Sequence, residues 1–397
     1  MRSVSSIWKA RHIHLLFLVY CVIAIIASAQ GLLHGPKQFV TGGTFYHEYN
    51  NYTIFKQSFF HLKDGKNLYQ PYPDEYWDLY KYSPSFALFF ALFSYLPDWL
   101  GLSLWCLLNS LLLFAAVYRL PGIADEKRSW ILLFCLIELL GSLQNAQSNA
   151  LMAALIIFAF ILLEDANYIM ATFCIVSSCY IKLFGAVGFA LFLMYPDKRK
   201  MIVYAILWFL ALGFLPALIS GFNPLIQSYK DWFKLIGEDR EGSQGLSLAG
   251  ILESWLRLEL PRNLITVAGI IVFCLPLTRT KMYRFLEFRV LMLSSVLLWI
   301  IAFNHKAESP TFIISVAGMA IWYFLKERNR RDTILLWLGF VLTTLSVSDL
   351  CPRPIREHFI IPFGIKGLMT VVIWIKVIYE LMKMNYWKML DYGMSRG

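Results

Sequence analysis

The chain has 397 residues, of which 58% are hydrophobic and 16% are charged. Soluble domains average about 45–50% apolar and about 25% charged residues, so this composition excludes an ordinary soluble protein and favours an integral membrane protein. The net charge of +10 does not indicate nucleic-acid binding, because the basic residues form short clusters between apolar runs, as in membrane proteins with basic cytoplasmic loops.

Residues 1–14 are basic and precede an apolar run from about His14 to Leu33. This run has no clear cleavage site, so we interpret it as a retained first span with a cytoplasmic N-terminus. A polar first outer loop follows at residues 34–82. Within it, Asn50, Asn51 or Thr53 can cap an amphipathic helix that ends at Gly65. Its apolar positions form one stripe, Ile54, Phe55, Ser58, Phe59 and Leu62. We expect this helix to lie along the bilayer surface; the alternative is a solvated loop with one amphipathic turn.

The remaining apolar runs predict one all-α polytopic membrane domain over residues 1–397, with about 12 spans. The second span opens at Lys81 and ends near Leu96, and the third runs from Leu102 to Tyr118. The short runs at 130–140 and 150–163 are either two spans or a re-entrant hairpin, which would give about 10 spans plus the hairpin. A second long outer loop is expected at 221–261. The basic clusters at 198–200, 279–289 and 326–331 fall on the side of the N-terminus, and the C-terminus also ends there.

Three groups of polar residues lie at or inside the predicted membrane ends. Lys182 interrupts the apolar run from Tyr168 to Tyr195, where a buried charge costs at least ~2.5–3.5 kcal/mol and is usually paired or functional. It can hold a phosphate, or it can snorkel or pair with Glu138.

The second group, His305, Lys306 and Glu308, combines an imidazole, an ammonium and a carboxylate at the outer end of one span. Such a set can move a proton or bind a phosphate, or it can be an ordinary polar turn. The third group is a turn rich in amides, which need partners from other helices or from a ligand's hydroxyls. Its members are Gln144, Asn145, Gln147, Ser148 and Asn149. The seven cysteines show no CxxC spacing and indicate neither disulfides nor a metal site.

Several of these segments follow a pattern in the same order along the chain. HLKDGKNLY at 61–69 is followed by Tyr82-Ser83-Pro84, by AQSN at 146–149, by KLFG at 182–185 and by His305. In this series the chain resembles the polyprenol-phosphate-mannose-dependent mannosyltransferases of glycosyltransferase family 87, membrane enzymes of the GT-C fold. The gapped matches extend from the first span to about residue 325.

The resemblance implies a hexosyltransferase, and in the first instance a mannosyltransferase, of the GT-C type. It would transfer a sugar from a polyprenyl-phosphate donor to a glycan or glycolipid acceptor at the outer face of the cytoplasmic membrane. The implied partners are this donor, the acceptor and membrane lipids, with no nucleic acid, no metal and no cofactor beyond the lipid-linked donor. The alternatives are a catalytically inactive relative that binds lipid-linked sugar, and a membrane transporter or flippase.

The resemblance also assigns roles to residues. Lys182 and Lys306 would hold the donor phosphate. The rest of the implied donor site comprises Tyr82, Gln147, Asn149 and Glu308. The implied catalytic positions are Glu48, Asn51 and His305. In the family an acidic residue opens the first-loop helix and acts as the base, but Asn50 and Asn51 stand here. An amide cannot accept that proton at neutral pH. The role would fall to Glu48 or His305, or the acceptor or the activity has changed.

Overall fold

The structure is a computed structural model that describes residues 4–40, 43–238, 245–257, 261–348, 351–387 and 389–390. It is almost entirely helical, apart from a short antiparallel pairing of β1 (Lys37–Gln38) with β2 (Phe45–Tyr46). The predicted all-α class is therefore confirmed. The chain divides into two compact units, each built from separate segments. Unit 1 comprises Met1–Ala116, Leu139–Ala186 and Arg199–Gly242, and unit 2 comprises the remainder. A single domain over the whole chain stays a prediction.

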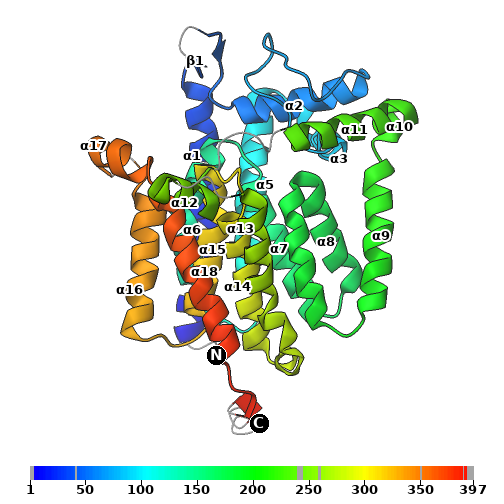
Figure 1. The fold of residues 1–397 in the computed structure, drawn as a ribbon. Helices are drawn as coiled ribbons and strands as arrows, with labels where there is room; N and C mark the ends of the chain where they lie inside the picture. Colours follow the sequence, from blue (N-terminus) through cyan, green and yellow to red (C-terminus); the bar gives the residue numbers. More distant parts are fainter. Residues whose placement is uncertain are drawn as a thin grey trace. The chain divides into compact units, whose positions relative to one another are not determined.

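Unit 1 holds the first outer loop and the helices that follow it (Figure 1). Its helices are α1 (Val4–Leu33), α2 (Asn50–Lys63), α3 (Pro84–Phe89), α4 (Ala91–Ser94), α5 (Asp98–Tyr118), α7 (Asn149–Glu164), α8 (Tyr168–Ile181), α9 (Lys198–Phe214), α10 (Ala217–Ser220) and α11 (Phe222–Glu238). Helix α6 (Asp125–Gln144) and the 3-10 helix η1 (Leu183–Met194) contribute residues to both units. Helices α7 and α8 pack side by side.

Helix α2 forms where the apolar stripe predicts it, and all five predicted apolar positions are buried. The stripe packs against α3 and α4, so protein covers the face that we expected to lie on the bilayer. The predicted stop is confirmed, because Gly65 adopts a left-handed conformation with φ 67°. The predicted cap is wrong. The N-cap position is Tyr49, and it makes no side-chain cap hydrogen bond.

The residues between Lys81 and Leu96 do not form the predicted second span. They fold into the short helices α3 and α4, and both ends of the segment meet neighbouring residues of α2. The Tyr82 ring lies 4.8 Å from the Phe55 ring, and Asp98 Oδ1 lies 2.6 Å from Lys56 Nζ. A span needs about 20 helical residues and separates its ends by about 30 Å. A segment that begins beside residue 55 and ends beside residue 56 therefore does not cross a membrane.

Aromatic packing explains why this segment resembles a span. Phe86 and Phe90 are buried and lie edge-on to the rings of Phe55 and Trp105, with centroids 5.1–6.2 Å apart. The run is apolar because it fills a protein interior. Asn51 Nδ2 of α2 donates to the Asn145 carbonyl at 2.9 Å, so the connection at 144–149 lies beside α2 within unit 1.

Among the described residues, three helical segments are long and apolar enough to cross a membrane, Ile13–Leu33, Asp98–Tyr118 and Lys198–Ser220. A fourth arises if Arg353–Ile360 and Ile365–Lys383, which are bent by 60° at a break, form one span. Further apolar helices have 10–17 residues. These segments indicate a membrane protein. They do not confirm the predicted total of about 12 spans, or of about 10 with a hairpin.

Unit 2 is built around α14, which is buried along most of its length and packs against α15 and α18 (Figure 1). Its elements after residue 244 are α12 (Leu248–Leu256), α13 (Arg262–Cys274), η3 (Pro276–Thr278), η4 (Thr280–Arg284), α14 (Leu286–Ala302), η5 (Ser309–Phe312), α15 (Ile313–Phe324), α16 (Arg330–Gly339), the π-helix η6 (Phe340–Leu345), α17 (Arg353–Ile355), η7 (Arg356–Ile360) and α18 (Ile365–Lys383). The predicted second outer loop, 221–261, is thus largely helical in its described part, because it carries α11 and α12.

A buried ion pair joins α18 to α6 within unit 2. Lys366 Nζ lies 2.7 Å from Glu138 Oε1, and the two side chains are 2% and 5% exposed. The same ammonium lies 5.1 Å from the centre of the Phe312 ring. The sequence allows Glu138 as a partner of Lys182, whereas the structure pairs this carboxylate with Lys366.

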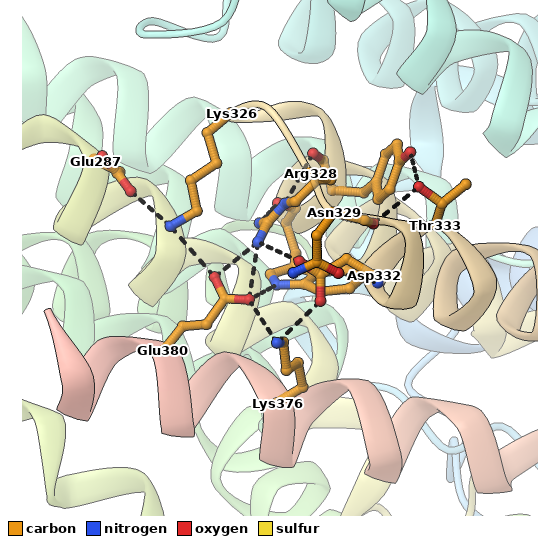
Figure 2. Close-up of polar contacts among 10 residues, drawn as sticks. Glu287, Lys326, Arg328, Asn329, Asp332, Thr333, Lys376 and Glu380 are labelled. Carbon is orange, nitrogen blue, oxygen red and sulfur yellow. Dashed lines mark hydrogen bonds and ion pairs between the residues drawn. The ribbon is translucent and has the colours of Figure 1, made fainter.

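A second charge network ties together α14, α15, α16 and α18, and Figure 2 shows its members. It contains the cations Lys326, Arg328 and Lys376 and the carboxylates Glu287, Asp332 and Glu380. Arg328 Nη1 donates to both oxygens of Glu380 at 2.8 Å, and the Arg328 side chain is 2% exposed. Part of the predicted basic cluster at 326–331 is therefore neutralised inside the protein.

Candidate functional site

The apolar run that contains Lys182 breaks at that residue. Helix α8 ends at Ile181, Lys182 has an extended backbone (φ −144°, ψ 128°), and the chain continues as η1. Lys182 Nζ donates to Asn149 Oδ1 at 2.7 Å and to Gln147 Oε1 at 3.3 Å. Both acceptors are neutral amides, and the two bonds position the ammonium.

The turn between α6 and α7 holds these amides in place. Ala146 adopts a left-handed conformation with φ 49°, and its carbonyl accepts a hydrogen bond from Trp105 Nε1 at 2.8 Å. Gln147 and Asn149 are buried, and Asn149 Nδ2 donates to Gln147 Oε1 at 2.8 Å. The amide-rich turn thus forms a preorganised acceptor pair for one cation.

The same turn carries a hydroxyl without a visible partner. Ser148 is 0% exposed, and its Oγ makes no hydrogen bond to any described residue. A buried polar atom of this kind normally binds water or a ligand. The sequence places Ser148 among the amides but indicates no role for it, because burial and the lack of a hydrogen-bond partner are properties of the tertiary structure.

Tyr82 lies next to the Lys182 ammonium, with the ring centre 5.6 Å from Nζ, and Phe184 lies at 5.8 Å. These distances allow cation–π attraction. The backbone around Tyr82 is fixed, because its carbonyl accepts from Tyr69 Oη at 3.0 Å and Ser83 Oγ donates to the Tyr180 carbonyl at 2.5 Å. The structure therefore brings together four of the predicted donor-site residues.

The two asparagines at the start of α2 use their amide nitrogens as donors. Asn50 Nδ2 donates to the Trp77 carbonyl at 2.8 Å, and Asn50 Oδ1 accepts from Trp77 N at 2.9 Å. Asn51 Nδ2 donates to the Asn145 carbonyl at 2.9 Å and so contacts the amide-rich turn. An ionised carboxylate cannot donate a hydrogen bond. The replacement of the expected acid by asparagine therefore has a structural reason at both positions.

Glu48 lies two residues before α2 and forms ion pairs. Its oxygens lie 2.6 Å from His34 Nδ1 and 3.1 Å from Lys37 Nζ. Burial raises the pKa of Glu48, but the hydrogen bonds with His34 and Lys37 outweigh this and lower the pKa below its usual value. Glu48 is consequently ionised at neutral pH and is a weaker base than an ordinary carboxylate.

His305, Lys306 and Glu308 lie in the turn between α14 and η5, in unit 2. The backbone N–H of Lys306 donates to Asn304 Oδ1 at 3.0 Å, and the Glu308 carbonyl accepts from Thr311 Oγ1 at 2.6 Å. His305 and Lys306 are half-buried, and Glu308 is exposed. Because these residues belong to a different unit from Lys182, their joint action with it stays a prediction.

A histidine–carboxylate pair in the first loop was not predicted. His61 is buried, and its Nε2 lies 2.9 Å from Glu75 Oε2, while its Nδ1 has no hydrogen-bond partner among the described residues. The Tyr72 ring lies 3.9 Å from the imidazole ring. Burial lowers the pKa of His61 below its usual value despite the nearby carboxylate. The available signal was the position of His61 on the inner side of the predicted helix, beside Leu62.

The described residues contain no group of three or more His, Cys, Asp or Glu side chains that could hold a metal ion. The expectation of metal-free chemistry stays a prediction, as does the expectation of no cofactor.

The sequence model of glycosyltransferase family 87 matches residues 80–348, which is more than half of the chain and includes Lys182 and the amide-rich turn. The chain belongs to glycosyltransferase family 87. No curated protein matches the chain. Family membership implies glycosyltransferase activity.

Proposed function

We propose that this family 87 protein transfers a hexosyl residue, mannosyl in the first instance, from a polyprenyl-phosphate donor to a glycan or glycolipid acceptor. The reaction takes place at the outer face of the cytoplasmic membrane, with both termini in the cytoplasm. The observation that carries the proposal is the Lys182 ammonium, which two neutral amides position at a break between apolar helices. Such a cation suits a phosphate at the membrane–water boundary.

The transfer requires the acceptor hydroxyl to attack the anomeric carbon of the sugar. The new C–O bond forms as the bond to the phosphate oxygen breaks, and the phosphate leaves with that electron pair. Lys182 stabilises the charge that develops on the leaving phosphate, and Ser148 Oγ can donate a hydrogen bond to the same ligand. Lys306 is a second candidate cation. The proton of the acceptor passes to Glu48 or His305, and no metal or cofactor is part of this proposal.

The test uses the purified full-length protein, a panel of radiolabelled polyprenyl-phosphate sugars and a membrane glycolipid extract as acceptor. Lys182→Ala is expected to reduce the rate by about 10²–10³-fold, because it removes one fixed charge from the leaving group. Lys182→Arg keeps the charge and is expected to retain more activity. Lys63→Ala removes an exposed lysine of α2 and serves as the matched control. Transfer that is undiminished in Lys182→Ala, Glu48→Ala and His305→Ala would exclude this mechanism.

A second function is favoured by one observation, the commitment of Asn50 and Asn51 to structural hydrogen bonds where an acidic base is expected. A relative without that base could bind a lipid-linked sugar without transferring it. Saturable binding of the labelled donor to the wild-type protein, with no product for any sugar of the panel, would support this function. Uptake of substrate into liposomes without any lipid-linked donor would instead support a transporter or flippase.

A further inference from the structure

Helix α11 has two apolar sides that face different surroundings. Leu225 and Trp232 are buried in unit 1, and Tyr229 lies between them on the same side of the helix. A second set, which we call the α11 stripe, is exposed and consists of Phe222 (64%), Ile226 (49%) and Phe233 (58%). At 3.6 residues per turn, the three stripe positions fall within about 40° of one another. The stripe is therefore a continuous apolar face that the described residues leave largely exposed.

Charged and polar residues follow the α11 stripe around the circumference of the helix. Lys230 lies about 40° beyond the edge of the stripe, and Lys234 follows about 40° further round the helix. Gln227 and Asp231 occupy the opposite side and are hydrogen-bonded to each other at 2.8 Å. An apolar face bordered by lysines, with acidic and amide groups opposite, is typical of a helix that lies in a membrane interface. The lysine stems can follow the apolar surface while the ammonium groups reach lipid phosphates.

The segment that precedes α11 is also apolar and exposed. The segment Lys198–Ser220 is long and apolar enough to span a membrane, and only 11% of its apolar window is buried inside the protein. Phe214 and Leu218, at the end of this segment, are 51% and 83% exposed. Gly221 then adopts φ 78° and α11 begins. Helix α11 thus follows directly on a segment that is long and apolar enough to span a membrane (Figure 1).

The buried side of α11 holds the backbone that carries Tyr82. Trp232 Nε1 donates to the Lys81 carbonyl at 3.1 Å. The Tyr229 hydroxyl lies 2.9 Å from Ser85 Oγ and donates to the Gly213 carbonyl at 3.0 Å. Helix α11 therefore carries the exposed stripe on one side and contacts the segment beside Lys182 with the other.

From these observations we propose that α11 is a membrane-interface helix, whose stripe inserts among lipid acyl chains and whose lysines bind anionic lipid headgroups. Helix α2, the surface helix that the sequence predicts, has its apolar face covered by protein; α11 occupies the lipid surface. The proposal does not depend on sugar transfer, so its failure and the failure of the proposed function are separate results.

The test measures the surroundings of single nitroxide labels on the full-length protein in nanodiscs of phosphatidylcholine and phosphatidylglycerol. Cys21, Cys274 and Cys351, the cysteines that are not buried, are first replaced by Ser. Labels at Ile226→Cys and Phe233→Cys are expected to collide severalfold more often with oxygen, which concentrates in lipid, than with a water-soluble nickel chelate. Labels at the matched positions Gln227→Cys and Asp231→Cys are expected to show the reverse preference.

A preference for the nickel chelate at the stripe positions would overturn the proposal, because the stripe would then face water. Low collision with both reagents would also overturn it, because a protein partner or a second copy would then cover the stripe. The lysine contribution is tested with the Phe233→Cys label. Adding phosphatidylglycerol is expected to raise its oxygen preference in the parent protein and in the control Lys63→Gln/Lys66→Gln. No such rise is expected in Lys230→Gln/Lys234→Gln. An equal rise in both double variants would exclude headgroup binding by these two lysines.

Discussion

Breaking the buried Glu138–Lys366 pair is expected to destabilise the protein strongly. At 2.7 Å and an effective dielectric constant of about 20, the attraction between the two charges is about 6 kcal/mol. This attraction offsets the penalty of several kcal/mol for removing each charge from water. In Glu138→Gln, Lys366 keeps its desolvation penalty and loses its counter-charge. We expect the free energy of unfolding to fall by about 3–5 kcal/mol, measured by SDS titration in mixed micelles with tryptophan fluorescence.

Two further variants make this prediction refutable. Glu138→Leu/Lys366→Met removes both charges and is expected to be as stable as the parent, or more stable by about 1–4 kcal/mol. The pair Lys127–Glu327 has the same 2.7 Å separation, but its side chains are 30% and 95% exposed. Glu327→Gln is therefore the matched control and should change stability little. The reasoning fails if Glu138→Gln is no more damaging than this control, or if the double apolar variant is as unstable as Glu138→Gln.

Four smaller perturbations have defined directions. Gly101→Ala would place its Cβ against the buried Tyr52 hydroxyl and is expected to cost about 1–3 kcal/mol in the same titration. Gly141→Ala meets no atom within 4 Å and should instead stabilise its helix by about 0.5–1 kcal/mol. Asn50→Asp loses the hydrogen bond from Asn50 Nδ2 to the Trp77 carbonyl and should lower the free energy of unfolding by about 1–3 kcal/mol. Unchanged stability would contradict the role given to that bond. Because burial lowers the pKa of His61, the unfolded state binds a proton more tightly, and α2 should lose stability as the pH falls below about 6.5. Hydrogen exchange of α2 amides, corrected for the intrinsic rate, would show this loss, and His61→Phe should remove it.

The sequence predicts local structure well where one face of a helix decides it. The apolar stripe of α2 and its stop at Gly65 appear as expected. The segment from Lys81 to Leu96 was misassigned because hydropathy does not distinguish lipid from an aromatic protein interior. The sequence predicts a polar loop where α11 lies, because lysines, an aspartate and a glutamine alternate there with the apolar residues and give the segment a mixed composition.

In the candidate site too, the sequence indicates local features but not the tertiary contacts. The pattern of one charge in an apolar run identified Lys182, and the order of motifs placed Tyr82, Gln147 and Asn149 with it. In the structure these four residues contact one another, and their role as a donor site stays a prediction. The choice of partners was not predictable, because Glu138 meets Lys366 across 228 residues of sequence. The unpartnered Ser148 hydroxyl and the buried His61 depend on packing, which no sequence spacing records.

The charge network of Figure 2 has a consequence for the order in which the protein is made. Arg328 precedes Glu380 by 52 residues, so a growing chain presents the cation well before its bidentate partner exists. During membrane insertion Arg328 therefore lacks Glu380, and its positive charge can help to orient the flanking helices. Only after α18 has been synthesised does Arg328 gain its two hydrogen bonds to Glu380, which add to the earlier pairing of Lys326 with Glu287 and of Arg328 with Asp332. A chain that ends before α18 is therefore expected to insert with the same orientation and to leave Arg328 without its bidentate partner.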